Sequence, residues 1–136
     1  GVMASPQARE AEILGKAHAM TDVTGFGLAG HLQAICRASG LAAELWAEAV
    51  PIYPGAQTLS DQGVASSLLA VNQADAPIAA ADPVNPLFHD PQTAGGLLAA
   101  LPEDAAKAAQ ARLKAEGLAG HIIGRLEAGA TSIRLR

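Results

Sequence analysis

The sequence predicts an α+β domain in which layered helices cover a mixed, largely antiparallel sheet. Three observations lead to this fold class. Helical and extended segments follow one another in mixed order, two strand-like runs close the chain, and 50% of the 136 residues are hydrophobic. A chain of this length fits the usual range of roughly 100 to 200 residues per domain. We therefore expect residues 1–136 to form a single domain.

The N-terminal part of the chain predicts a helix, a strand and a second helix. Ser5-Pro6 resembles an N-cap followed by proline in the first turn, so residues 7–14 are expected to be helical. Residues 17–21 form a short extended run that enters a glycine-rich stretch. Apolar residues then recur at helical spacing from Leu28 until Ser39-Gly40, which is typical of a helix end.

The middle of the chain is less regular. Residues 41–46 alternate as a strand, with Glu44 opposite the apolar face, and residues 56–62 form a short helix closed by glycine. Residues 66–76 do not discriminate between helix and strand. The four prolines at positions 77 to 91 predict an irregular surface loop, because each removes a backbone donor.

The C-terminal part predicts a strand, a helix and a hairpin. Residues 97–101 are a continuous apolar run, short enough to be a buried strand. Pro102-Glu103-Asp104 starts a helix that continues to Gly117. Residues 121–126 and 131–135, separated by a short turn, are expected to pair as a terminal hairpin.

Composition restricts the possible partners. The net charge is −4, the basic residues are scattered and aromatics make up 3%, so a nucleic-acid partner is not expected. No apolar run approaches the roughly 18 residues of a membrane helix, so we expect no membrane partner. The single cysteine, Cys36, excludes an internal disulfide and fits a cytoplasmic location.

The most informative stretch is residues 21–31, which joins the first strand to the second helix. Gly25, Gly27 and Gly30 match the pattern G-x-G-x-x-G, in which glycines let backbone N–H groups approach an anion at a helix N-terminus. The same spacing also fits a helix-entry turn that needs glycine for a positive φ. His31 is expected to be a helix-face histidine with a satisfied hydrogen bond.

Asp22 changes the interpretation of this loop. A carboxylate beside a bound phosphate requires a divalent cation between them, and Mg²⁺ is usually held by one or two carboxylates plus phosphate oxygens. A lone aspartate that caps its own turn is the commoner arrangement. The chain has no Gly-Lys-Ser or Gly-Lys-Thr loop, so Asp22 and the glycines predict half of a metal-phosphate site.

A second polar turn leads into the strand expected at residues 97–101. It could form a wall beside the first loop, or it could be a plain turn. Its candidate residues are Asp90, Gln92, Thr93, Gly95 and Gly96.

Both stretches resemble motifs of the selenophosphate synthetase (selenide, water dikinase) family. Residues 21–31 are similar to its Thr-Asp-Val-Thr-Gly-Phe-Gly-Leu-Leu-Gly-His signature, and residues 90–98 to Asp-Pro-Gln-Thr-Ser-Gly-Gly-Leu-Leu. The chain departs from these signatures at Ala29 and Ala94. The resemblance extends over residues 63–72, where the family carries a Gly-rich turn and an Asn, but residues 66–86 align poorly and receive no role.

The resemblance implies the C-terminal domain of the aminoimidazole ribonucleotide synthetase-like fold, with partial ferredoxin-like topology. Members of the family convert selenide, ATP and water into selenophosphate, AMP and phosphate, using Mg²⁺. It implies Asp22 as a metal ligand and a loop on the phosphate side of ATP that consists of Thr24, Gly25, Phe26 and Gly27.

The family also requires an N-terminal domain that carries a reactive Cys or selenocysteine, a Lys and further Asp residues. Cys36 does not match that catalytic position, so no catalytic residue is assigned in this chain. We expect the chain to be a fragment of a larger enzyme, inactive alone, whose partners are its own N-terminal domain and, as a homodimer, a second copy.

Two alternatives from other classes remain. A Rossmann-type dinucleotide binder is disfavoured because Thr21-Asp22 is polar where a buried strand should run, and no series of βαβ units follows. A non-catalytic binding or assembly module of the same superfamily would keep the fold without the chemistry. Other relatives of aminoimidazole ribonucleotide synthetase are a third possibility, but the two motif strings point away from them.

Overall fold

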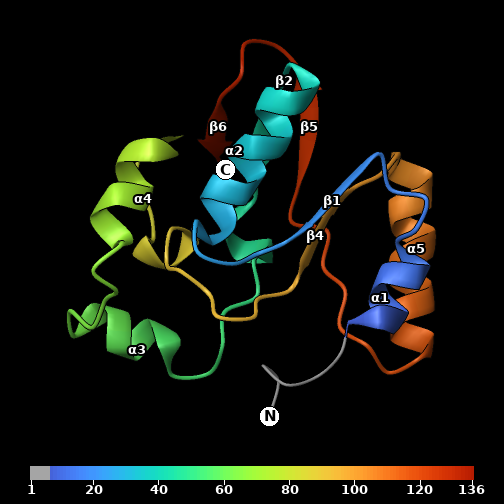
Figure 1. Ribbon diagram of the computed structural model, residues 1–136, viewed down its shortest axis with the longest axis horizontal. Helices are drawn as coiled ribbons and strands as arrows, with labels where there is room; N and C mark the ends of the chain where they lie inside the picture. The colour runs from blue at the N-terminus through green and yellow to red at the C-terminus, as the bar shows by residue number, and fades with distance from the viewer. Residues whose placement is uncertain (1–6) are drawn as a thin grey trace.

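The computed structural model describes residues 7–136, and the helix start predicted at Ser5-Pro6 lies outside this range. Helices and strands alternate irregularly along the chain, as expected for an α+β domain (Figure 1). Their order is α1 (Ala8–Ile13), β1 (Ala19–Asp22), α2 (Gly27–Ser39), β2 (Leu41–Leu45), η2 (Ala47–Ala49), α3 (Ala56–Asp61), α4 (Leu69–Asp75), β3 (Ile78–Ala79), η3 (Pro86–Phe88), β4 (Leu97–Ala100), α5 (Glu103–Ala115), β5 (Gly124–Ala128) and β6 (Ile133–Leu135).

The strands form two sheets. The smaller sheet pairs β1 with β4 in antiparallel register, with Asp22 opposite Leu97. The larger sheet has the order β3-β6-β2-β5, in which β2 is antiparallel to β5 and parallel to β6, and β3 is parallel to β6. Mixed pairing of this kind confirms the predicted fold class.

The predicted terminal hairpin is wrong. β5 and β6 do not pair with each other but lie on the two edges of β2. β2 is buried from Ala42 to Leu45, so it is the strand that gains most from a neighbour on each side. Strands that flank a third strand are only about 10 Å apart, a span that the short connection between β5 and β6 can cover.

The two segments that the sequence described least well acquire regular structure. Residues 66–76 contain the helix α4, and the proline-rich segment contains the short strand β3 and the 3₁₀ turn η3. Pro86 occupies the first turn of η3, where its missing N–H is not needed, and Asn85 Oδ1 accepts a hydrogen bond from Leu87 N at 3.0 Å. Prolines therefore mark the starts of β3 and η3 and do not prevent regular structure in this segment.

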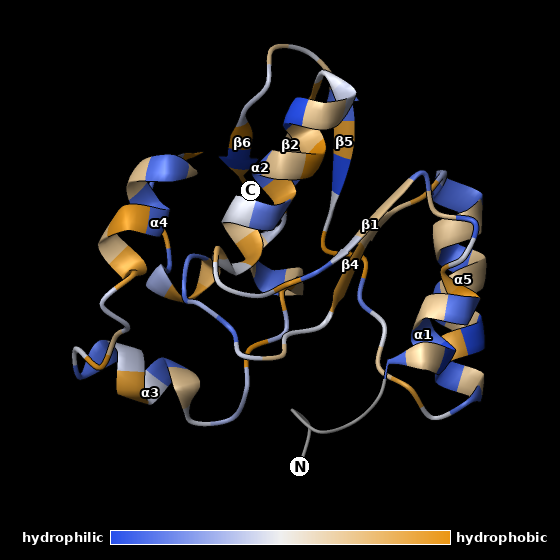
Figure 2. Ribbon diagram, viewed as in Figure 1, coloured by the Kyte–Doolittle hydropathy of each residue, from blue (hydrophilic) through white to orange (hydrophobic). Residues whose placement is uncertain are grey.

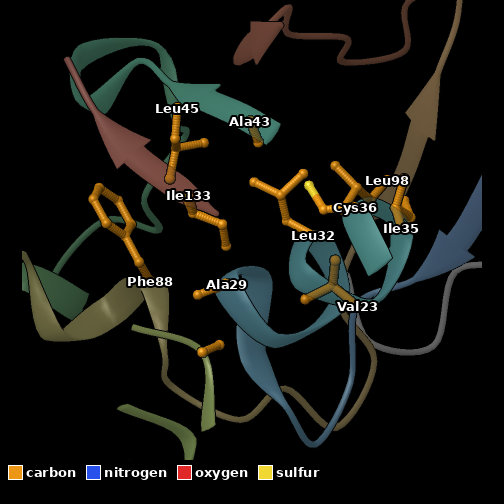
Figure 3. Packing of buried hydrophobic residues seen from close by; sticks show 11 residues of the cluster. Val23, Ala29, Leu32, Ile35, Cys36, Ala43, Leu45, Phe88, Leu98 and Ile133 are labelled. Carbon is orange, nitrogen blue, oxygen red and sulfur yellow. The ribbon is translucent and has the colours of Figure 1, made fainter. Parts of the chain in front are cut away.

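One hydrophobic cluster joins α2 to both sheets (Figure 3). Leu32, Ile35 and Cys36 of α2 are buried in it together with Leu45 of β2 and Ile133 of β6. The cluster also contains Val23, from the first motif, and Phe88, two residues before the second motif. Both motifs are thus anchored in the core.

A smaller cluster packs α1 against α5 through Ile13, Ala109 and Leu113. Figure 1 places this helix pair on the far side of the β1-β4 sheet from α2. Within residues 7–136, every helix is too short or too polar to cross a bilayer.

The segment from Ile52 to Val71, which contains α3 and part of α4, exposes large apolar side chains. They are Ile52, Tyr53, Leu59, Val64, Leu68 and Val71. Figure 2 shows hydrophobic residues on both helices.

Candidate functional site

The backbone of the two motifs is hydrogen-bonded into one structure. Val23 N donates to Gly96 O at 3.0 Å, and Gly95 N donates back to Val23 O at 3.0 Å. One residue further along, Gln92 N donates to Thr24 O at 3.0 Å. The second motif is therefore the immediate neighbour of the glycine loop.

Two of the motif glycines are required by this packing. Gly27 has φ 66°, and a Cβ there would lie 2.7 Å from the carbonyl carbon of His89. A Cβ on Gly95 would collide with the carbonyl oxygen of Val23. Any larger residue would push the two loops apart at both positions.

The fold does not require two further motif glycines, Gly25 and Gly96. Gly25 and Gly96 are exposed, and a Cβ at either position would meet nothing within 4 Å. Neither has a positive φ. Glycine also serves where a bound group must approach the backbone closely, and this use fits both positions.

The Asp22 carboxylate is available for a ligand. Asp22 is the last residue of β1, in which half-buried and exposed residues alternate, and it lies on the exposed face of the strand. Within residues 7–136, its carboxylate takes part in no side-chain hydrogen bond or ion pair. The turn-capping arrangement considered from the sequence is therefore not formed.

A magnesium ion would fit Asp22 only with ligands from elsewhere. Mg²⁺ commonly takes one or two carboxylates and completes its octahedron with phosphate oxygens and water. The described part of the chain contains no group of three or more His, Cys, Asp or Glu side chains that could hold a metal. Asp22 can thus supply one ligand to a shared site.

The backbone of the glycine loop leaves two amides open. Thr24 N donates to His31 Nε2 at 3.0 Å, which confirms His31 as a hydrogen-bonded helix-face residue, and Gly27 N donates to Thr24 O at 3.1 Å. In the described structure, no acceptor is bonded to the N–H of Gly25 or Phe26. Both residues are exposed, so these donors can reach a bound anion.

Asn72 is a site residue to which sequence reasoning assigned no role. It lies on α4 with 5% exposure, and its Nδ2 donates to Gly25 O at 2.9 Å and to His89 O at 3.0 Å. The only signal in the sequence was the Asn that the resemblance places at the end of residues 63–72. Its contacts are 47 and 17 residues away in the chain, so no local pattern reveals them.

Comparison with known proteins agrees with this geometry. The model of the family "AIR synthase related protein, C-terminal domain" matches residues 4–135. The chain is 44% identical over 116 residues to a selenide, water dikinase of Cronobacter sakazakii, covering 80% of this chain and 32% of that protein. It is 36% identical over 123 residues to the selenide, water dikinase of Pseudomonas straminea, covering 85% and 34%.

A crystal structure of tt0281 from Thermus thermophilus is also similar, with a TM-score of 0.59 and 26% identity over 93% of this chain and 34% of that one. The chain spans about a third of the length of the curated relatives it matches. These likenesses confirm the family resemblance carried by the two motifs and the fold class predicted from the order of helices and strands. By its family match and its fold, the chain belongs to the AIR synthase related protein, C-terminal domain family.

Proposed function

We propose that this chain is the C-terminal domain of a selenide, water dikinase, which makes selenophosphate, AMP and phosphate from selenide, ATP and water. The relatives that carry this name support the proposal, since they match most of the chain at 36% to 44% identity. The observation that carries it is the exposed, unpaired Asp22 carboxylate at the end of β1, directly before a loop with two backbone N–H groups that have no acceptor in the described structure. A carboxylate and free amides at one strand end would suit a metal ion together with a phosphate.

In this proposal the chain contributes binding and electrostatics. Asp22 supplies one oxygen ligand to Mg²⁺, and the amides of Gly25 and Phe26 donate to phosphate oxygens. When bound, the metal neutralises charge that develops during phosphoryl transfer. The second motif holds the loop in place through the backbone bonds of Gln92 and Gly95 to Thr24 and Val23.

The remaining parts of the site would come from the N-terminal domain of the same protein. The exposed apolar side chains between Ile52 and Val71 support such a docking, because several large apolar side chains exposed within one segment are available to a partner surface. We further propose a cytoplasmic homodimer as the complete enzyme, with the isolated chain inactive.

The test is Asp22→Asn in the complete protein, with selenophosphate formation measured against Mg²⁺ concentration. Loss of the charged ligand is expected to reduce Mg²⁺-dependent turnover by roughly 100-fold or more. Asp104→Asn, an exposed acid on α5, is the matched control and should leave turnover unchanged. Turnover near the wild-type value in the Asp22 variant would contradict the proposal.

A second candidate is a non-catalytic module of the same superfamily. It shares the fold and the family match with the first proposal, and residues 7–136 contain no group of three or more His, Cys, Asp or Glu side chains that could hold a metal. The coding sequence upstream of the chain separates the two proposals. A Cys or selenocysteine with a nearby Lys and an Asp-rich segment would favour the dikinase.

A further inference from the structure

We infer that Asn72 is a positioning residue that aims the Phe26 amide N–H out of the glycine loop, toward the phosphate oxygens of a nucleotide. The inference rests on the proposed function, because it concerns the same loop. It assigns a role to a helix, α4, that neither motif contains.

The Asn72 side chain ties both loops to α4. Its Nδ2 carries two N–H groups, which match the two carbonyls it contacts: Gly25 O at 2.9 Å and His89 O at 3.0 Å. Asn72 is 5% exposed, so water competes little for these bonds. One buried amide thus sets the position of a carbonyl in the first motif and of one directly before the second.

The bond to Gly25 determines where the next amide points. A peptide unit is planar and trans, so its C=O and its N–H point in opposite directions, and residues 7–136 contain no cis peptide. Because the Gly25 carbonyl is directed inward to Asn72, the N–H of Phe26 is directed away from it. That N–H has no acceptor among the described residues, and Phe26 is 64% exposed.

His89, which accepts one of the two Asn72 hydrogen bonds, has two further contacts. His89 Nε2 donates to Ala76 O at 2.8 Å, at the end of α4, while the His89 carbonyl receives Asn72. The backbone of His89 also lies against Gly27, where no Cβ fits. Asn72 on α4 is therefore bonded to Gly25 and His89, and His89 in turn contacts Gly27 at the start of α2. These contacts hold the Gly25–Phe26 peptide from its carbonyl side.

The chemistry requires an amide at this position. Aspartate has the same shape but would place a carboxylate oxygen opposite two carbonyl oxygens. An apolar side chain would remove the donor from the buried carbonyl of His89 and from the partly buried carbonyl of Gly25. In either case the Gly25–Phe26 peptide is free to rotate, and the preorganised donor to the phosphate is lost.

The experiment compares Asn72→Asp with Asn85→Asp. Asn85 contacts Leu87 and Gln57 but neither motif carbonyl, so it is a control of identical chemistry. In the complete protein, Asn72→Asp is expected to raise the KM for ATP about tenfold relative to the control. Ile133→Val, at a buried position of β6, controls for a general loss of stability.

A second readout requires no activity. The chain contains two phenylalanines, so ¹⁵N-Phe labelling of this chain yields two amide signals. Phe88 N is bonded to Asn85 O at 3.1 Å and should exchange slowly with solvent, whereas Phe26 N–H should exchange fast. Asn72→Asp is expected to shift the Phe26 signal, whereas Asn85→Asp should leave the Phe26 signal in place. If the Asn72→Asp variant does not fold, the same measurements are made on Asn72→Ser.

The outcomes separate the two proposals. If Asp22→Asn leaves turnover intact, the proposed function fails. If Asp22→Asn abolishes turnover while Asn72→Asp has the KM of Asn85→Asp and an unshifted Phe26 signal, the positioning role is overturned. A fall in kcat and stability that matches Ile133→Val, with unchanged KM, also overturns it.

Discussion

The carboxylates of Glu44, in the larger sheet, and Asp22, in the smaller sheet, have opposite surroundings. Glu44 of β2 is 6% exposed, and its side chain accepts hydrogen bonds from Trp46 Nε1 at 2.9 Å and from Arg134 Nη2 at 2.8 Å. Arg125, the residue opposite Glu44 on β5, places its Nε 3.4 Å from Glu44 Oε1. Asp22 of β1 is exposed and has no such partner in the described structure. The fold uses the first charge and leaves the second for a ligand.

The same contrast separates the glycines of the first motif. Gly27 adopts φ 66° against the backbone of His89, whereas a side chain on Gly25 would meet nothing. Groups that the fold uses should change stability when they are replaced. Groups that it leaves free should change only binding or turnover.

Gly27→Ala is expected to have the largest effect on stability. The variant must place a Cβ at positive φ and 2.7 Å from the His89 carbonyl carbon, so the free energy of unfolding should fall by about 2–4 kcal/mol. Urea unfolding of the chain measures it. Gly40→Ala has a similar φ, 64°, but open space around it, and should lose only about 1 kcal/mol. Equal losses would show that the approach to His89 does not matter.

Glu44→Gln is expected to have a smaller effect that depends on pH. The hydrogen bond from Trp46, then that from Arg134, lowers the pKa of Glu44 from 4.5 to about 2. The carboxylate therefore stabilises the fold fully above pH 4.5, and this contribution is lost as the pH falls through about 2.

Unfolding of wild type and variant at several pH values measures this difference. The gap in stability should be widest near neutral pH and close toward pH 2. Glu103→Gln, at an exposed carboxylate on α5 paired with Lys107, is the control and should show almost no gap. A Glu44 gap that is constant with pH would contradict the role of the charge.

Sequence periodicity predicted the elements that have strong local patterns. The helices α2 and α5 and the strands β2 and β4 lie close to their expected bounds, because apolar spacing and capping residues mark them. The order of β5, β2 and β6 could not be predicted, since pairing depends on which strand the core buries. The first strand begins and ends later than expected, and this shift places Asp22 within it.

The candidate site shows the same division. The motifs located Asp22 and the glycines, because their residue types are unusual at that spacing. They could not indicate which glycines the fold requires, since that depends on His89 and Val23, which approach only in the folded chain. Nor could they indicate that Asn72 joins the loops across the fold.

Gly25→Ala is expected to leave the free energy of unfolding within about 0.5 kcal/mol of wild type, because the added methyl group meets no atom and the backbone needs no positive φ. In the complete protein the same methyl group should obstruct a phosphate and reduce turnover about tenfold. Urea unfolding and selenophosphate formation measure the two effects. A large loss of stability with normal turnover would reverse the assignment of this glycine.

Asp22→Asn is expected to have the smallest effect on stability, although the same variant should have a large effect on turnover. Its carboxylate has no partner to lose within residues 7–136, and it is exposed. Urea titration of this chain should therefore give the wild-type free energy of unfolding within experimental error, at both neutral and acid pH. Glu44→Gln, measured alongside, should differ from wild type at neutral pH and approach it as the pH falls toward 2. If Asp22→Asn destabilises the chain as Glu44→Gln does, the fold uses the Asp22 charge after all, and a loss of turnover in the complete protein would no longer identify a metal ligand.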